Sequence, residues 1–256
     1  MKPETKHKLI YLIVFILMYI ILNYVPFGFF MDTIPLLIFR LCYYALMIFP
    51  VIYFKNHLRI EIERPLQKLH YLVLIPFLIP CLMDIIYCNI YEAEFNIGFS
   101  LTELLLETAV DLFDSIVEDI IFVDVLIAFL FDIIHKKKKR NIRCMLFSAA
   151  FFSLIRCYVF IYESPLDAML TIFVTSIITF ACAYLAIYFD SALIPIIFHF
   201  LFNVPNFVIA PILFNYSTEP EYVIFTILFM VPLLAYTFFI YILSEKKYHR
   251  MNVEYS

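Results

Sequence analysis

Long runs of apolar residues constrain this chain more than any other feature of its sequence. A hydrocarbon core about 30 Å thick is crossed by roughly 20 apolar residues of α-helix. Of the 256 residues, 64% are hydrophobic and 16% are charged. A soluble domain of this size needs far more polar surface, so we expect an integral membrane protein. The runs are Leu9–Val25, Ile34–Phe54, Tyr71–Tyr91, Leu101–Ile134, Cys144–Tyr162, Ala168–Phe189, Ala192–Phe214 and Tyr222–Leu243.

These runs predict an all-α fold, a polytopic membrane helical bundle of about eight transmembrane helices. Only short polar connectors separate them, so residues 1–256 are expected to form a single integral membrane domain. The first run lacks a small-residue cleavage site, and another run follows at once, which favours a retained span over a removed signal peptide. Membrane lipids are the expected partners, and nothing in the sequence indicates nucleic acid. The sequence does not predict an oligomeric state.

The basic residues predict how the chain is oriented in the membrane. Connectors on the cytoplasmic side carry an excess of Lys and Arg. In an eight-span arrangement, 16 of the 18 Lys and Arg residues fall on one side, while acidic residues occupy the opposite connectors. Both termini are therefore predicted to be cytoplasmic, and a bacterial plasma membrane is the expected location. The two remaining basic residues, Arg40 and Arg156, then lie inside the membrane.

The run Leu101–Ile134 carries most of the acidic residues found within predicted spans. Five of them recur at spacings of three or four residues and therefore share one helical face: Glu103, Glu107, Asp111, Asp114 and Glu118. For the first three we expect an amphipathic position at the outer interface, with their carboxylates in water. Glu118 and Asp119 lie too deep for this explanation. Ionisable groups at that depth are paired, line a cavity or take part in chemistry.

Four polar residues from separate runs are predicted at a similar depth, near the middle of the membrane. Glu118 belongs to the fourth run, Arg156 to the fifth, and His199 and Asn203 to the seventh. His199 and Asn203 are four residues apart and therefore lie on one helical face. One interpretation is a shared polar pocket. The other is a buried ion pair between Glu118 and Arg156 that joins two helices. The spacing alone leaves both open.

Three segments in this order resemble the motifs of the CPBP family of membrane endopeptidases (CAAX proteases and bacteriocin-processing enzymes, also called the Abi family). Residues 117–124 resemble its first motif, Glu-Glu-x-x-x-Arg. Residues 148–156 resemble the second, Phe-x-x-x-His, and residues 191–203 resemble the third, His-x-x-x-Asn. The resemblance extends over about residues 103–208 and implies a CPBP/CAAX-protease-like core at residues 101–214.

The motifs are incomplete. Glu118 matches the first Glu of the family, and Asp119 conservatively replaces the second. Val123 stands where the first motif has Arg, and Arg156 stands where the second has His. The third motif is intact in His199 and Asn203.

The resemblance implies an intramembrane endopeptidase that hydrolyses peptide bonds of membrane-associated substrates, either prenylated peptides or peptide precursors. Glu118 and Asp119 would supply the carboxylates, with Glu118 activating the attacking water. His199 and Asn203 would position that water or stabilise the oxyanion. Zn²⁺ is the cofactor to consider, with Glu118 and His199 as its candidate ligands. Two ligands are a thin set for zinc, and Arg156 is not a ligand.

Arg156 leaves three function classes open. A permanent cation beside Glu118 makes that carboxylate a poorer base. Alternatively, Arg156 replaces the Arg missing at Val123 and acts as an oxyanion donor. The chain is then either a working variant of the protease or a catalytically degenerate pseudoprotease that acts as a membrane binding or immunity protein. A transporter ranks third, because the sequence shows none of the repeats common in that class.

Overall fold

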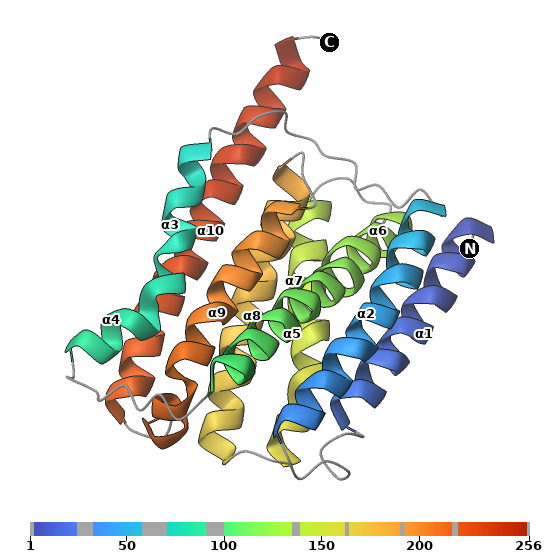
Figure 1. Cartoon of the computed structure of the whole chain (residues 1–256). Coiled ribbons are helices and arrows are strands. Elements are labelled where there is room, and N and C mark those ends of the chain that lie inside the picture. The colour runs from blue at the N-terminus through green and yellow to red at the C-terminus, as the bar shows by residue number, and fades with distance from the viewer. Residues whose placement is uncertain are drawn as a thin grey trace.

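The computed structural model describes residues 3–24, 33–57, 71–90, 100–134, 139–161, 164–189, 193–216 and 220–254. Throughout these residues the chain is helical, and they contain no β-strand (Figure 1). The prediction of an all-α fold is therefore confirmed. Each described stretch overlaps one of the eight apolar runs of the sequence.

The longer helices follow the apolar runs closely. They are α1 (Pro3–Tyr24), α2 (Thr33–His57), α5 (Leu101–Glu118), α7 (Arg140–Arg156), α8 (Pro165–Tyr188), α9 (Leu193–Tyr216) and α10 (Pro220–Glu254). Shorter elements are η2 (Tyr71–Leu74), α3 (Ile75–Leu78), η3 (Pro80–Leu82), α4 (Met83–Ile90), the π-helical η4 (Asp119–Val125), α6 (Leu126–Ile133) and η5 (Cys157–Ile161).

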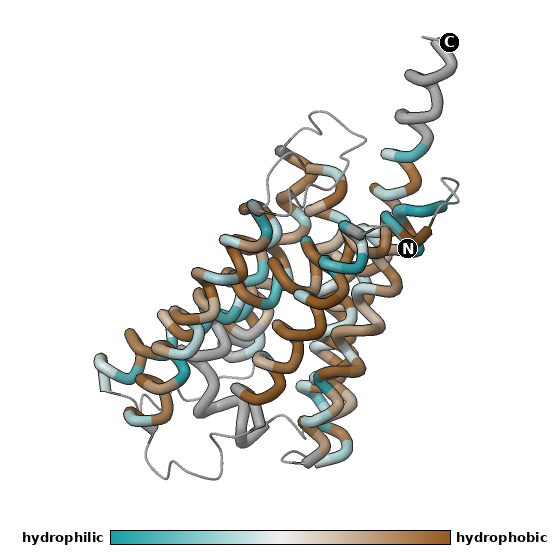
Figure 2. Tube along the Cα trace, turned by 90° about the vertical axis from the view of Figure 1, so that its right-hand side faces the viewer, coloured by the Kyte–Doolittle hydropathy of each residue, from teal (hydrophilic) through white to brown (hydrophobic). Residues whose placement is uncertain are grey.

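Four of the described helices are long and apolar enough to cross a membrane. They cover Ile34–Asn56, Arg140–Phe160, Pro165–Tyr188 and Pro220–Glu245. Hydrophobic residues extend along much of the bundle (Figure 2). Large apolar side chains on its outside are exposed, as Phe49 is at 77%, which is the pattern expected of a surface that faces lipid. These features indicate an integral membrane protein, while the number of eight spans remains a prediction.

Helix α8 forms the centre of one half of the bundle. It packs against α7, α9 and α10, and its second half, from Ile177 to Tyr188, is buried. Small residues in this half, including Ala181, Cys182 and Ala183, let neighbouring helices approach closely. The start of α8 is fixed by Ser164, whose hydroxyl accepts a hydrogen bond from the Asp167 amide, with Pro165 next in the chain.

Helix α5 packs between α2 and α9 and leads directly through η4 into α6 (Figure 1). Its first turn carries a capping box, in which the Ser100 hydroxyl accepts from the Glu103 amide and the Glu103 carboxylate accepts from the Ser100 amide. The long fourth run of the sequence is thus one continuous helical path. A π-helical segment lies in its middle, directly after Glu118.

The third run differs from the single helix expected there. Its described part, Tyr71–Ile90, is divided into two 3₁₀ turns and two short α-helices. Pro76 and Pro80 explain the breaks, because proline lacks the N–H of a helical hydrogen bond and its ring clashes with the preceding turn.

Candidate active site

Polar residues predicted from three separate runs meet inside the bundle. Glu118 ends α5, and Asp119 begins η4. Arg156 ends α7, and His199 lies on α9. The side chains of Glu118, Asp119 and His199 are buried. The structure therefore brings these residues together as the depth argument predicted.

The π-helical segment η4 places two consecutive acids at this site. A π-helix bonds each amide to a carbonyl five residues back and so has more residues per turn than an α-helix. Consecutive side chains are then separated by a smaller rotation, and Glu118 and Asp119 both reach His199. The altered bonding changes which carbonyls are paired within the helix. The Ser148 hydroxyl of α7 donates to one of them, the Phe122 carbonyl.

Glu118 receives two donors on the same carboxylate oxygen. The Arg156 guanidinium and the Tyr19 hydroxyl of α1 both donate to Oε1. The other oxygen, Oε2, is buried and has no hydrogen-bond partner among the described residues. His199 Nε2 lies 3.6 Å from this oxygen. One carboxylate oxygen is thus occupied, and the other faces the imidazole.

Arg156 is held by aromatic rings as well as by charge. Its Nη1 donates to the Tyr158 hydroxyl at 3.1 Å. Its guanidinium carbon lies 5.2 Å from the centre of the Phe152 ring and 6.0 Å from that of Tyr19, within cation–π range. The buried Nε has no hydrogen-bond partner among the described residues. Arg156 is thus paired with Glu118, and within the described part of the chain its Nε–H has no acceptor.

His199 lies between the two acids. Its Nδ1 is 3.2 Å from Asp119 Oδ1, while Nε2 faces Glu118. Asn203, one turn further along α9, contacts a different group: its amide nitrogen is 3.5 Å from the Ser115 hydroxyl. The two residues of the intact third motif thus have different neighbours. His199 belongs to the acidic cluster, and Asn203 borders it through Ser115.

The outer part of the acidic stripe is more enclosed than expected. Asp111 and Asp114 are buried, although Asp111 was expected to lie in water. The packing of α5 between α2 and α9 explains this difference, because it covers the face that carries the stripe. Arg40 of α2, the second basic residue predicted inside the membrane, interacts electrostatically with both acids.

Two further residues of the site were not predicted. Tyr19 lies on α1, outside all three motifs, and Cys182 lies on α8 between the second and third motifs. Neither has a sequence signal of its own, since an isolated Tyr or Cys in an apolar run is ordinary.

A group of three side chains beside Glu118 suits a divalent metal better than the predicted pair of Glu118 and His199. Its carboxylate comes from the next residue, Asp119. Glu118 is a poor ligand because Arg156 already holds one of its oxygens with a positive charge. Asp119, Cys182 and His199 instead form a group whose ligand atoms all lie within 4.8 Å of one another. A carboxylate, a thiolate and an imidazole are the ligand types that zinc takes in proteins. The residues present therefore fit such an ion, through Asp119 rather than Glu118.

The arrangement is a membrane helical bundle that brings buried carboxylates and an imidazole together. Residues 100–205 match the family described as type II CAAX prenyl endopeptidase Rce1-like. Over these residues the match supports the CPBP/CAAX protease family that the three motifs predicted. No curated protein and no solved structure gave a significant match to the chain.

Proposed function

We propose that this chain is a membrane-embedded CAAX-type endopeptidase that hydrolyses peptide bonds of membrane-associated peptides, either prenylated or precursor peptides. The family match supports a protease of this type. The observation that carries the proposal is the state of Glu118. Its Oε1 is held by Arg156 and Tyr19, whereas the buried Oε2 has no hydrogen-bond partner in the described part of the chain.

In this proposal Glu118 is the general base. Its Oε2 accepts a proton from water as the water oxygen bonds to the scissile carbonyl carbon. The carbonyl oxygen takes up the negative charge and forms a tetrahedral intermediate. When the C–N bond breaks, the protonated Glu118 returns the proton to the leaving amine. Water is consumed, and a carboxylic acid and an amine result.

Arg156 has two roles in this scheme. Through its Nη2 it fixes the Glu118 carboxylate in one orientation. Its Nε–H, which has no partner among the described residues, can donate to the oxyanion. Arg156 would thereby replace the first-motif Arg, which is missing at Val123. His199 bridges the two acids and orients them, and Asn203 borders the site through Ser115.

A second candidate function is favoured by the same ion pair. A carboxylate that is permanently paired with a guanidinium is a weak base. On this account the chain is a pseudoprotease that binds a membrane-associated peptide without cutting it. The contact between Arg156 and Glu118 is the specific observation in its favour.

Cleavage assays in proteoliposomes separate the two candidates. A panel of prenylated peptides and leader peptides is presented to the unaltered chain, Glu118→Gln and Arg156→His. Glu107→Gln is the matched control, a carboxylate on the same face of α5 about three helical turns before Glu118.

If the proposal is right, the unaltered chain and Glu107→Gln cut, and Glu118→Gln loses at least about 100-fold in kcat/KM. If only Arg156→His cuts, the native chain is a disabled protease and the second candidate stands. Equal cleavage by the unaltered chain and Glu118→Gln contradicts both assignments of Glu118.

A further inference from the structure

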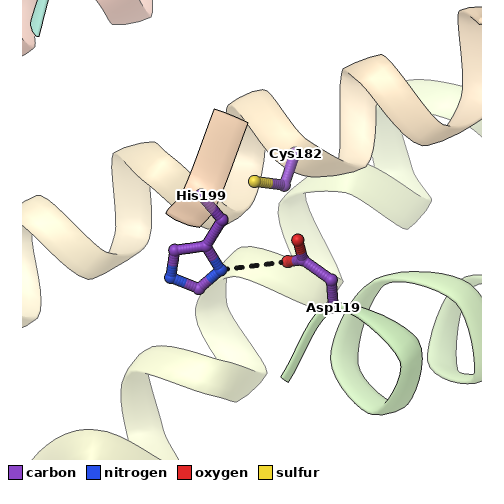
Figure 3. A group of neighbouring side chains, drawn as sticks. All are labelled: Asp119, Cys182 and His199. Carbon is purple, nitrogen blue, oxygen red and sulfur yellow. Dashed lines mark hydrogen bonds and ion pairs between the residues drawn. The ribbon is translucent and has the colours of Figure 1, made fainter. Parts of the chain in front are cut away.

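Three metal-ligating side chains from three different helical elements converge beside Glu118. Asp119 comes from η4, Cys182 from α8 and His199 from α9. Their exposed fractions are 4%, 0% and 7%, so water has little access to the group. Figure 3 shows the sulfur of Cys182 and the carboxylate of Asp119 on the same side as the imidazole nitrogen of His199 that faces them.

The separations suit a tetrahedral ion after a small adjustment. Zinc binds nitrogen and oxygen at about 2.0–2.1 Å and sulfur at about 2.3 Å, which puts neighbouring ligand atoms roughly 3.3–3.6 Å apart. His199 Nδ1 and Asp119 Oδ1 are already 3.2 Å apart. Since all three ligand atoms lie within 4.8 Å of one another, the sulfur needs to approach by no more than about 1.2–1.5 Å.

The group has unused binding capacity. Asp119 Oδ2 is buried and has no hydrogen-bond partner among the described residues. The sulfur of Cys182 lies 3.9 Å from the Pro195 carbonyl and also interacts with the Asp119 carboxylate. A buried polar atom without a partner is costly, and a bound ion would satisfy Asp119 Oδ2.

Charge balance also favours a dication here. The carboxylate and the thiolate together carry two negative charges, which a divalent cation neutralises within a buried environment. Binding requires the thiol proton of Cys182 to leave, so one proton is released to solvent for each ion bound. The adjacent pair of Glu118 and Arg156 is separately neutral and leaves this balance unchanged.

Glu118 provides the carboxylate hydrogen-bond acceptor that metal-bound histidines usually have for their second ring nitrogen. Coordination through Nδ1 places the proton of His199 on Nε2, which faces the unpaired Glu118 Oε2 at 3.6 Å. Carboxylate partners of this kind orient the imidazole and strengthen metal binding about 10–100-fold. Arg156 and Tyr19, which donate to Glu118 Oε1, hold that carboxylate in place.

From this geometry we propose that Asp119, Cys182 and His199 form a three-residue binding site for a divalent cation of the zinc class. Three protein ligands leave the fourth tetrahedral position for water or a substrate carbonyl, and the ion would act there as a Lewis acid. The site differs from the predicted pair of Glu118 and His199, because its carboxylate is Asp119 and its third ligand comes from α8. It stands whether or not the chain cuts peptides.

The experiment is a Co²⁺ titration of the full-length chain in detergent, followed by optical absorption. Cobalt replaces zinc in tetrahedral sites, and a thiolate ligand gives a charge-transfer band in the near ultraviolet. We expect one equivalent of Co²⁺ to bind with this band, Zn²⁺ to displace it, and about one proton to be released for each ion. Absence of the band in the unaltered chain overturns the proposal without recourse to any variant.

Variants then assign the ligands. Cys182→Ser is expected to lose the band and at least about tenfold in affinity, and Asp119→Asn to keep the band with a similar loss of affinity. Cys144→Ser, which removes a buried cysteine of α7 outside the group, is the matched control and should behave as the unaltered chain. Loss of the band in Cys144→Ser with retention in Cys182→Ser contradicts the assignment.

Failure of this site and failure of the proposed protease are distinguishable. Glu118→Gln removes the proposed base but no ligand, so it should retain the charge-transfer band and lose cleavage. Cleavage by an unaltered chain that binds no Co²⁺ leaves the protease in place and removes the metal site. Binding of Co²⁺ without cleavage supports the metal site and contradicts the proposed protease.

Discussion

At the scale of single residues, Arg156 determines what the buried site can do. A histidine at this position could gain and lose a proton during a reaction, whereas the guanidinium of arginine stays protonated. The Arg156 side chain neutralises Glu118 and is itself enclosed by the rings of Phe152 and Tyr19. Removal of the Arg156 charge leaves the buried Glu118 carboxylate without its partner, and this is the costly case for an ion pair inside a protein.

A double-mutant cycle at Glu118 and Arg156 measures this coupling. We expect Arg156→Met alone to lower the free energy of unfolding by about 3–5 kcal/mol, because it strands the Glu118 carboxylate. Glu118→Gln combined with Arg156→Met should lose less than the sum of the single changes. Unfolding with SDS in mixed micelles provides the free energies. Additive losses would mean that the two side chains are not coupled.

The site residues on the motifs could be predicted, whereas those outside them could not. Glu118, Arg156 and His199 were placed at one level because the position of a residue along a span follows from the fixed rise of a helix. Contacts from Tyr19 and Cys182 depend instead on which helices lie side by side. The apolar pattern does not encode that order, because every lipid-facing and every buried helix is hydrophobic in such a bundle.

At the scale of elements, η4 is the feature that shapes the site. It lies directly after Glu118 and lets consecutive acids face His199. The sequence predicted one continuous helical run through this segment and could not predict its π-helical bonding. Apolar periodicity does not report such bonding, nor a contact from another helix such as that of the Ser148 hydroxyl, which donates to the Phe122 carbonyl.

Ser148→Ala tests how far this partner supports η4. The substitution removes the donor and leaves a buried carbonyl without its hydrogen bond, so we expect a loss of about 1–3 kcal/mol in unfolding free energy. Thr108→Val is the matched control, because the Thr108 hydroxyl donates to Leu104 within its own helix. The control should change stability by no more than about 0.5 kcal/mol. Equal losses in both variants would show that the Ser148 hydroxyl has no special role.

The first turn of α5 offers an independent test at the same scale. Ser100→Ala removes the side-chain acceptor of the capping box, and we expect a loss of about 1 kcal/mol in the same unfolding measurement. Ser100→Asp keeps an acceptor at that position and should retain most of the stability. If the aspartate variant loses as much as the alanine variant, the capping interaction does not explain the start of this helix.

At the scale of the whole molecule, the contact between Lys8 and Asp132 constrains the number of spans. Four described helices meet the length and hydropathy needed to cross a membrane. If those four alone crossed it, a single crossing would separate Lys8 from Asp132, and the two residues would lie on opposite sides. Yet Lys8 Nζ lies 2.9 Å from Asp132 Oδ2. This contact requires an even number of crossings between them, as the eight-span arrangement has. The ends of α1 and α10 at Pro3 and Glu254 also lie toward the same end of the bundle (Figure 1).

Reporter fusions decide between four spans and eight. With the N-terminus in the cytoplasm, eight spans put positions 62 and 138 in the cytoplasm and positions 94 and 218 outside. Four spans instead put 62 and 138 outside, where the basic run of residues 136–140 would contradict the usual excess of Lys and Arg on the cytoplasmic side. A fluorescent protein that matures only in the cytoplasm should therefore fluoresce at 62 and 138, and alkaline phosphatase should be active at 94 and 218. Phosphatase activity at 62 would contradict the eight-span prediction, because it requires an odd number of crossings before the third apolar run.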